Sequence, residues 1–239
     1  MKSKSATIIS VGDEILSGDV VDTNSTWLAK RLSTQGVDVE KIMAVGDDVD
    51  AIGEVIKSCH SDFIFVMGGL GPTHDDVTRE GVAKGVSKEL ERNEVAERAL
   101  REKYGIRGSL LKMADMPAGS EVIANPVGVA PGFRMENIIV LPGVPEEMMS
   151  MFDEIASLFR DDKGIRKEGW IMTDKSEHEI LEVLNEAVKE FVDVKIGSYP
   201  YVDREGEGKS YKLRLKLLSA DPDALKRAKR WLEERIKIC

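Results

Sequence analysis

The glycine-rich segment Gly68-Gly-Leu-Gly-Pro-Thr73 is the strongest candidate for chemistry in the sequence. It follows an apolar run, residues 63–67, and precedes a pattern typical of a helix start. Glycines allow backbone N–H groups to approach an anion closely, and the N-terminus of the next helix adds partial positive charge. We therefore expect a phosphate group to be held by Gly68, Gly69, Gly71, Pro72 and Thr73. The alternative is a tight strand-to-helix turn, closed by a Thr-x-x-Asp cap, with no ligand.

Two adjacent carboxylates, Asp75 and Asp76, follow this segment directly. They would repel an anionic ligand unless a cation lay between the carboxylates and the ligand. Mg²⁺ typically takes one or two carboxylates together with substrate phosphates and waters, and a bound metal can lower the pKa of water enough to make a nucleophile. The pattern therefore favours a divalent metal next to the phosphate. A solvated acidic helix cap without a metal is the alternative.

Further acids and one amide follow the other apolar runs of the first half of the chain. These residues are Asp13 and Glu14, Asp22 and Asn24, Asp47 and Asp48, and Glu146 and Glu147. Each one alone is best explained as a helix-capping residue, because Asp and Asn are common at helix N-termini. Their recurrence, however, places them on one rim if the strands are parallel, and ligands of open α/β sheets bind at that rim.

The elements that position these residues alternate between strands and helices. Strands are predicted over residues 6–11, 37–45, 63–67 and 138–141, and helices over 24–35, 50–59, 93–104 and 146–159. The continuous apolar runs indicate strands that are buried on both faces, which is typical of a parallel sheet. Short apolar pieces at 122–124 and 132–134 predict an antiparallel edge. The fold class is therefore α/β, with a mostly parallel sheet.

A second, smaller α/β domain is predicted after a polar hinge at residues 161–164. Strands are expected at 170–173, 194–197 and 211–218, and helices at 177–191 and 224–236. The resulting domains are residues 1–163 and residues 166–239. The βαββα order of the second domain is KH-like, but a GxxG clamp for RNA is missing. We expect this domain to serve as a dimerisation element or as a lid over the site.

The overall composition is that of an ordinary globular protein. Of the 239 residues, 42% are hydrophobic and 32% are charged, which excludes disordered, collagenous and low-complexity classes. The apolar runs are much shorter than the roughly 20 residues that span a bilayer, and the N-terminus has no signal-peptide pattern. Cys59 and Cys239 form no CxxC motif, so neither a disulfide framework nor a thiolate metal site is expected. We expect a cytoplasmic protein with no membrane partner.

The net charge of −9 is unevenly distributed. Residues 166–239 carry 16 Lys and Arg against 15 Asp and Glu, a balance of +1, and residues 1–165 carry 18 against 28, a balance of −10. Because binding to nucleic acid depends on basic surface that neutralises phosphates, we do not expect a nucleic acid partner.

Four motifs along the chain resemble those of the CinA family. They are Val11-Gly-Asp-Glu-Ile-Leu-Ser-Gly18 with Asp22-Thr-Asn24, the glycine segment continued to Thr78, Asn125-Pro-Val-Gly-Val-Ala-Pro-Gly132, and Leu141-Pro-Gly-Val-Pro-Glu-Glu-Met148. Their order is that of the family's N-terminal domain, which has the MoaB/Mog-like molybdopterin-binding fold. The segment Ile196-Gly-Ser-Tyr-Pro200 resembles the unit that follows in the family. Bacterial CinA proteins continue into a nicotinamide-mononucleotide deamidase domain, which we do not expect here because the sequence ends at Cys239.

The resemblance implies a three-layer α/β fold and a pyrophosphatase, a hydrolase that uses Mg²⁺, Mn²⁺ or Co²⁺ to cleave ADP-ribose or FAD-like dinucleotides. The alternative is a molybdopterin-binding protein of molybdenum cofactor biosynthesis, either a binding module or an adenylyl transferase. By the same resemblance Asp47 and Asp76 would bind the metal. Asp75, Asp22 and Glu146 are second choices as ligands or general base, and Asn24, Gly143 and Pro145 would contact the ligand.

Two further expectations follow from the resemblance. Leu70 stands where Mog proteins usually have Thr, and this difference speaks against molybdopterin itself. Mog-like domains often self-associate, so we expect a homo-oligomer that binds a small nucleotide or pterin.

Overall fold

The computed structural model describes residues 3–203 and 210–237. The chain divides into two compact units, Met1–Gly164 and Ile165–Cys239. No helix in the described part of the chain is long and apolar enough to cross a membrane.

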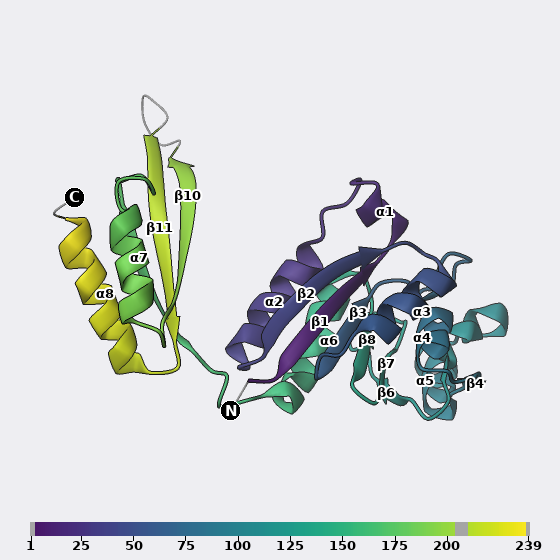
Figure 1. Cartoon of the computed structure of the whole chain (residues 1–239). Helices are drawn as coiled ribbons and strands as arrows, with labels where there is room; N and C mark the ends of the chain where they lie inside the picture. Colours follow the sequence, from purple (N-terminus) through teal and green to yellow (C-terminus); the bar gives the residue numbers. More distant parts are fainter. Residues whose placement is uncertain (1–2, 204–209, 238–239) are drawn as a thin grey trace. The chain divides into compact units, whose positions relative to one another are not determined.

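The first unit is built on a six-stranded sheet with the strand order β2-β1-β3-β8-β7-β6 (Figure 1). The strands are β1 (Ser5–Val11), β2 (Asp38–Val45), β3 (Phe63–Met67), β6 (Glu121–Ile123), β7 (Gly132–Met135) and β8 (Ile138–Leu141). The four strands β2, β1, β3 and β8 run parallel, whereas β7 and β6 pair antiparallel at the edge. The prediction of a mostly parallel sheet with an antiparallel edge is confirmed.

Helices flank this sheet and connect its strands. They are α1 (Asp13–Leu16), α2 (Thr23–Thr34), α3 (Val49–Ser58), α4 (Thr78–Gly85), α5 (Glu94–Tyr104) and α6 (Pro145–Ile155), with the 3₁₀ segments η1 (Gly108–Ala114) and η2 (Ala156–Phe159). A small ribbon of β4 (Leu90–Arg92) and β5 (Asp115–Pro117) stands beside α4. The predicted helix over 146–159 is thus an α-helix that ends in a 3₁₀ turn.

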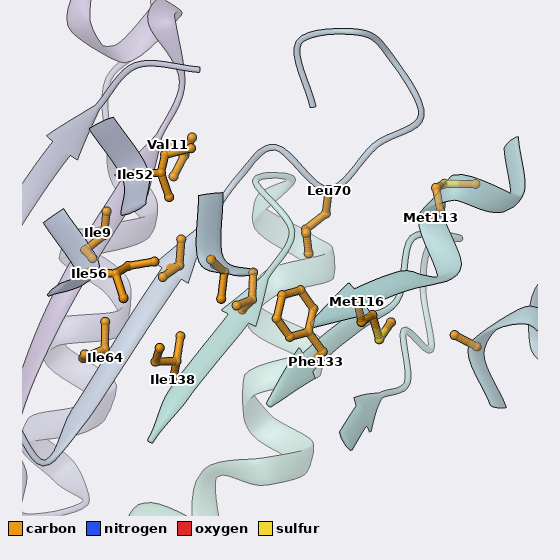
Figure 2. Close-up of a cluster of buried hydrophobic side chains, with 14 of the residues drawn as sticks. Ile9, Val11, Ile52, Ile56, Ile64, Leu70, Met113, Met116, Phe133 and Ile138 are labelled. Atoms are coloured by element: carbon orange, nitrogen blue, oxygen red, sulfur yellow. The ribbon is translucent and has the colours of Figure 1, made fainter. Parts of the chain in front are cut away.

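The sheet is buried on both faces because neighbouring residues of its central strands belong to different hydrophobic clusters. Ile9 and Val66 pack with α3, α4 and η1 in one cluster, part of which Figure 2 shows. Ile8 and Phe65 pack with α2 and α6 in the other. Two-sided burial explains the continuous apolar runs in the sequence and gives three layers, helix, sheet and helix.

The second unit is a three-stranded antiparallel sheet with two helices. Its elements are β9 (Lys167–Thr173), α7 (Leu181–Glu190), β10 (Lys195–Asp203), β11 (Ser210–Ser219) and α8 (Pro222–Ile236), with the strand order β10-β11-β9. Leu213, Leu215 and Leu217 of β11 are fully buried among side chains of both helices.

Two boundaries in this unit differ from the prediction. The helix expected from residue 177 begins at Leu181, because hydrogen bonds between Ser176 and Glu179 close a separate turn before it. The strand expected at 194–197 continues to Asp203. It pairs with β11 along its whole length at the edge of the sheet, where Pro200 is tolerated.

Candidate functional site

A cavity of about 740 Å³ opens at the carboxyl ends of β1, β3 and β8. It brings together nearly all of the residues predicted to form a site. Its lining includes Asp22, Asn24, Asp47, Gly68, Gly69, Gly71, Pro72, Thr73, Asp75, Asp76, Gly143 and Pro145. Glu146 is exposed and does not line the cavity, whereas its neighbour Glu147 does. The helix α6 begins at Pro145, and its turn directs the second of the two glutamates to this side.

The glycine segment crosses from β3 to α4 in a conformation that requires its first two glycines. Gly68 has φ 105° and lies against the carbonyl of Val11, and Gly69 has φ 62° and lies against the hydroxyl of Thr78. A side chain at either position would meet these groups and strain the backbone. The loop is therefore held close to the end of β1.

Asp76 fills the centre of this loop. Its carboxylate accepts hydrogen bonds from the backbone N–H groups of Gly71 at 2.7 Å and Thr73 at 2.8 Å, and from the Thr73 hydroxyl. Thr73 and Asp76 are thus paired as the alternative expected, but the pair closes the loop and does not cap a helix, because α4 begins at Thr78, has Val77 as its N-cap and has no side-chain cap bond. The same geometry shows that the loop arranges its N–H donors around a negatively charged group.

Arg79 lies beneath the loop and was not singled out from the sequence. Its side chain is buried, and its guanidinium donates hydrogen bonds to the backbone carbonyls of Leu70 and Gly71. Burial lowers its pKa to about 10, so the group stays charged at neutral pH. A fixed positive charge therefore supports the loop from the side of α4. An arginine in the first turn of a predicted helix gave no signal that it would be buried.

Leu70 explains how the loop is anchored from below. Its side chain is 2% exposed and belongs to the same hydrophobic cluster as Phe133 and Met113 (Figure 2). The residue that differs from the usual Mog pattern therefore packs into the core beneath the loop.

The acidic rim centres on Asp47. Its carboxylate accepts a hydrogen bond from the N–H of Asp13 at 2.9 Å, and the carboxylate of Asp13 accepts one from the N–H of Asp47 at 3.2 Å. Burial raises the pKa of Asp47, and the negative charges of Asp13, Glu14 and Asp75 raise it further. Asp75 is thus the member of the Asp75-Asp76 pair whose charge acts on Asp47, while Asp76 bonds to the loop.

These carboxylates offer hard oxygen donors of the kind that Mg²⁺ prefers. Among the residues that the structure describes, no group of three or more His, Cys, Asp or Glu side chains is arranged to hold a metal ion. A metal here would therefore need ligand phosphates to complete its coordination.

Asp22 and Asn24 tie the start of α2 to the floor of the cavity. Asp22 caps the helix by accepting from the N–H of Ser25 at 2.9 Å, and it also accepts from the hydroxyl of Ser10 on β1 at 2.8 Å. The amide nitrogen of Asn24 donates to the carbonyl of Gly143 at 2.7 Å. The Asn24 amide oxygen is buried and has no hydrogen-bond partner among the residues that the structure describes. Asn24 therefore contributes an unpaired acceptor next to the cavity that it lines.

Apolar side chains form the remaining walls, which sequence reasoning missed. One wall comes from η1 and the residues before it, with Ile106, Leu110 and Met113. Leu110 is 42% exposed although it is a large aliphatic residue. The ammonium group of Lys112 on η1 donates to the carbonyl of Thr73, so this wall is fixed to the glycine loop.

Asn125 shapes the loop that borders the cavity between β6 and β7. Its side chain accepts from the N–H groups of Val127 at 3.2 Å and Gly128 at 2.7 Å, and it donates to Glu147 at 2.6 Å. Asn125 is buried, so these bonds satisfy a polar group that would otherwise be costly. This motif therefore builds the wall that carries Gly128 and Val129.

Comparison with known families and proteins agrees with this architecture. Residues 7–161 match the family described as a probable molybdopterin binding domain, and residues 170–238 match the middle domain of FAD synthase. A protein of Archaeoglobus fulgidus is 39% identical over 229 residues, which cover 95% of this chain and 96% of that protein.

Two relatives carry the name CinA. The crystal structure of the protein CinA from Thermoplasma acidophilum, described as having unknown function, is 38% identical, with a TM-score of 0.63 over 66% of this chain and 98% of that chain. A CinA-like protein of Frankia casuarinae is 39% identical over 163 residues, which cover 62% of this chain and 38% of that protein. The resemblance inferred from the four motifs is confirmed.

Proposed function

The chain belongs to the family of probable molybdopterin binding domains, and from this premise we propose that its cavity binds a phosphorylated pterin of the molybdopterin type. The observation that carries the proposal is the hydrogen bonding of Asp76, whose carboxylate accepts from the N–H groups of Gly71 and Thr73. Donors that surround a carboxylate suit the oxygens of a phosphate group equally well.

The residues around the loop have separate roles in this proposal. The ligand phosphate would take the N–H groups that Asp76 now occupies, and the buried charge of Arg79 would offset part of its negative charge. The amide of Asn24, whose oxygen is unpaired among the described residues, would turn toward the cavity to accept a hydrogen bond from an N–H group of a pterin ring. Leu110 and Ile106 offer an apolar surface on which a flat ring can pack.

The proposal is tested by calorimetric titration of the full chain with molybdopterin, adenosine 5′-phosphate and ribose 5-phosphate. We expect molybdopterin to bind most tightly. Leu110→Ala should weaken binding of molybdopterin and adenosine 5′-phosphate, which carry a flat heterocyclic ring system, by about tenfold and leave ribose 5-phosphate unchanged. The matched control is Val95→Ala, which changes an exposed aliphatic residue on α5 that does not line the cavity.

A second variant separates the phosphate from the ring. Asp76→Ala removes the carboxylate that competes with the ligand phosphate for the N–H groups of Gly71 and Thr73, and we expect it to strengthen binding of all three ligands by a similar factor. Circular dichroism would establish that the variant is folded. Failure of every ligand to bind to the folded wild-type chain would overturn the proposal.

A second candidate function is hydrolysis of the pyrophosphate bond of ADP-ribose or FAD. It is favoured by the negative charges of Asp13, Glu14 and Asp75, which act on Asp47. Asp47 and Asp75 would hold Mg²⁺, Mn²⁺ or Co²⁺, with Asp76 as a further donor. Such an ion would polarise a phosphoryl group and lower the pKa of bound water. The chain itself contributes the loop N–H groups and Arg79, which stabilise negative charge on the phosphates.

This candidate is tested by measuring release of adenosine 5′-phosphate from ADP-ribose and FAD with each metal and with EDTA. We expect metal-dependent release that is lost in Asp47→Asn and retained in Asp193→Asn, an exposed control in the second unit. Release that continues in EDTA would exclude the metal role of Asp47, and no release with any metal would exclude the hydrolase and leave the binding function.

A further inference from the structure

The three-stranded sheet of the second unit has one face that its helices leave open. Along β11, Leu213, Leu215 and Leu217 point into the core, so the alternate residues lie on the opposite face. Figure 1 shows α7 and α8 together on one side of β10 and β11. We call the other side of the sheet the open face.

The open face carries a row of cations. Lys212, Arg214 and Lys216 alternate along β11, and two residues of a strand span about 6.6 Å. Lys195 of β10 stands opposite Leu218 and adds a fourth positive charge on the same face. Glu168, paired with Lys216 at 3.0 Å, is the one acid placed there by the register among side chains that the structure describes.

Aromatic and soft apolar side chains flank this row on both neighbouring strands. Tyr199 stands opposite Arg214 and is 49% exposed, whereas Trp170 stands opposite Lys216 and is 40% exposed. Met172 of β9 also faces Arg214 and is 67% exposed. A hydrophobic side chain of this size is rarely left open without a partner when its neighbours are also exposed.

Cations and rings are already in contact across the open face. The guanidinium of Arg214 lies 4.7 Å from the ring centre of Tyr201, and the ammonium of Lys216 lies 5.2 Å from that of Trp170. These contacts hold the long basic side chains flat over the sheet. A hollow of about 700 Å³ adjoins them and reaches α8, because it is lined by Trp170, Met172, Tyr201 and Lys212 of the strands and also by Glu233 and Ile236 of the helix.

We infer that the open face binds single-stranded nucleic acid. An extended strand presents one phosphate per nucleotide, at a repeat similar to that of the cations on β11, and its unpaired bases can stack on Trp170, Tyr199 and the plane of Arg214. A duplex hides its bases and would use only the charges. An acidic protein surface would use the charges but leaves the exposed rings unexplained.

The net charge of the chain had argued against a nucleic acid partner. That expectation rests on an average over all residues, and the second unit has a balance of only +1. Strand alternation concentrates four cations on one face, whereas Asp221 and Asp223 are carried by the start of α8 and the turn before it, and Glu233 of α8 lines the adjoining hollow. Local charge, which phosphates sense over roughly 10 Å, is therefore positive.

The experiment is fluorescence anisotropy of a labelled oligouridylate of about 12 nucleotides with the full chain, at low and at physiological salt. We expect Arg214→Ala/Lys216→Ala to weaken binding at least tenfold. The matched control is Lys226→Ala/Arg227→Ala, which removes the same charge from the exposed surface of α8 and should change binding less than twofold. The wild-type chain should bind the single strand at least tenfold more tightly than a duplex of the same length.

A variant that keeps every charge tests the stacking. We expect Trp170→Leu/Tyr199→Leu to weaken the single-stranded complex about tenfold, and thermal unfolding would show that both pairs of variants are folded. Equal losses in the Arg214/Lys216 variant and the α8 control would overturn the inference, because binding would then follow net charge alone. A second result would also overturn the inference: no binding of oligouridylate, together with a change of oligomeric mass in light scattering for the open-face variants. That result would assign the open face to contact with a second copy of the chain.

Discussion

Asp47 is the residue at which burial and charge conflict most clearly. Its pKa is raised first by burial and then by the charges of Asp13, Glu14 and Asp75. A carboxyl group with a raised pKa in the folded protein binds a proton more tightly there than in the unfolded chain, whose value is near 3.8. Its favourable contribution is therefore present below that value and is lost as the pH rises through the folded pKa.

Replacing this group should stabilise the metal-free protein at neutral pH. In EDTA, we expect Asp47→Asn to raise the free energy of unfolding at pH 7 by up to about 1 kcal/mol, because the variant keeps the acceptor for the Asp13 N–H and loses the repulsion. The gain should shrink as the pH falls toward 3.8. Urea denaturation at several pH values measures it, with Asp193→Asn as the control.

The Asp47→Asn variant also tests whether Asp47 binds a divalent cation. If Asp47 helps to hold a divalent ion, Mg²⁺ should raise the melting temperature of the wild-type chain and leave Asp47→Asn unchanged. Equal shifts in both proteins would mean that the ion binds elsewhere, and a lower stability of the variant in EDTA would contradict the charge argument.

At the residue scale, the sequence predicted which residues lie at the site better than it predicted which groups those residues contact. The carboxyl ends of β1, β3 and β8 brought the predicted acids and glycines to one cavity, because parallel strands end at a common edge. Whether the charge of Asp75 or of Asp76 acts on Asp47 depends on the path of a short loop, and the order of two adjacent residues in the sequence does not determine it. The exposed Leu110 and the buried Arg79 depend on packing between segments distant in the chain.

At the scale of elements, the glycine loop is held from three directions. Leu70 anchors it in the core, Asp76 ties its N–H groups together, and Arg79 from α4 binds its carbonyls. The carbonyl of Leu70 and the N–H of Gly71 belong to one peptide bond and point in opposite directions, so capture of this carbonyl by Arg79 turns the Gly71 N–H toward Asp76 on the other side. The anion-binding property therefore belongs to β3, the loop and α4 together.

Loss of the Arg79 guanidinium, which binds two carbonyls of the loop, should lower the stability of the protein and weaken ligand binding. We expect Arg79→Met to lower the free energy of unfolding by about 2–4 kcal/mol, because two backbone carbonyls are left without a donor. Arg79→Lys should recover only part of this, since one ammonium group lacks the planar fork. Urea denaturation measures both variants against Arg98→Met, which changes an exposed arginine on α5.

The binding consequence is measured separately at a temperature where each variant is folded. We expect Arg79→Lys to weaken ribose 5-phosphate and molybdopterin by the same factor, because the loop is common to both. A stable Arg79→Met variant with unchanged phosphate binding would show that the loop holds its shape without the arginine.

Most elements of the first unit followed from periodicity, because their strands are buried on both faces and their helices on one. The elements that were not predicted are those whose structure depends on contacts with distant parts of the chain. The segment η1 combines glycine with scattered apolar residues and has no clear period, so it was not predicted, although it supplies a wall of the site. Strand β10 carries no apolar alternation past Gly197, and its extension follows from pairing with β11.

At the scale of the whole molecule, the two units have separate hydrophobic cores. The clusters around β1, β3 and β8 contain residues of the first unit alone, and the cluster around Leu215 contains residues of the second alone. A unit with its own core can fold by itself, although one as short as Ile165–Cys239 is close to the size at which a single core becomes marginal.

We therefore expect fragments 1–164 and 165–239 to fold independently. Calorimetry of the full chain should resolve two transitions, and a saturating phosphate ligand should raise only the transition that fragment 1–164 reproduces, because a ligand stabilises the unit that binds it. Oligouridylate should raise only the other. One transition that shifts with either ligand, or a fragment 165–239 that remains unfolded by circular dichroism, would show that the second unit depends on the first for its stability.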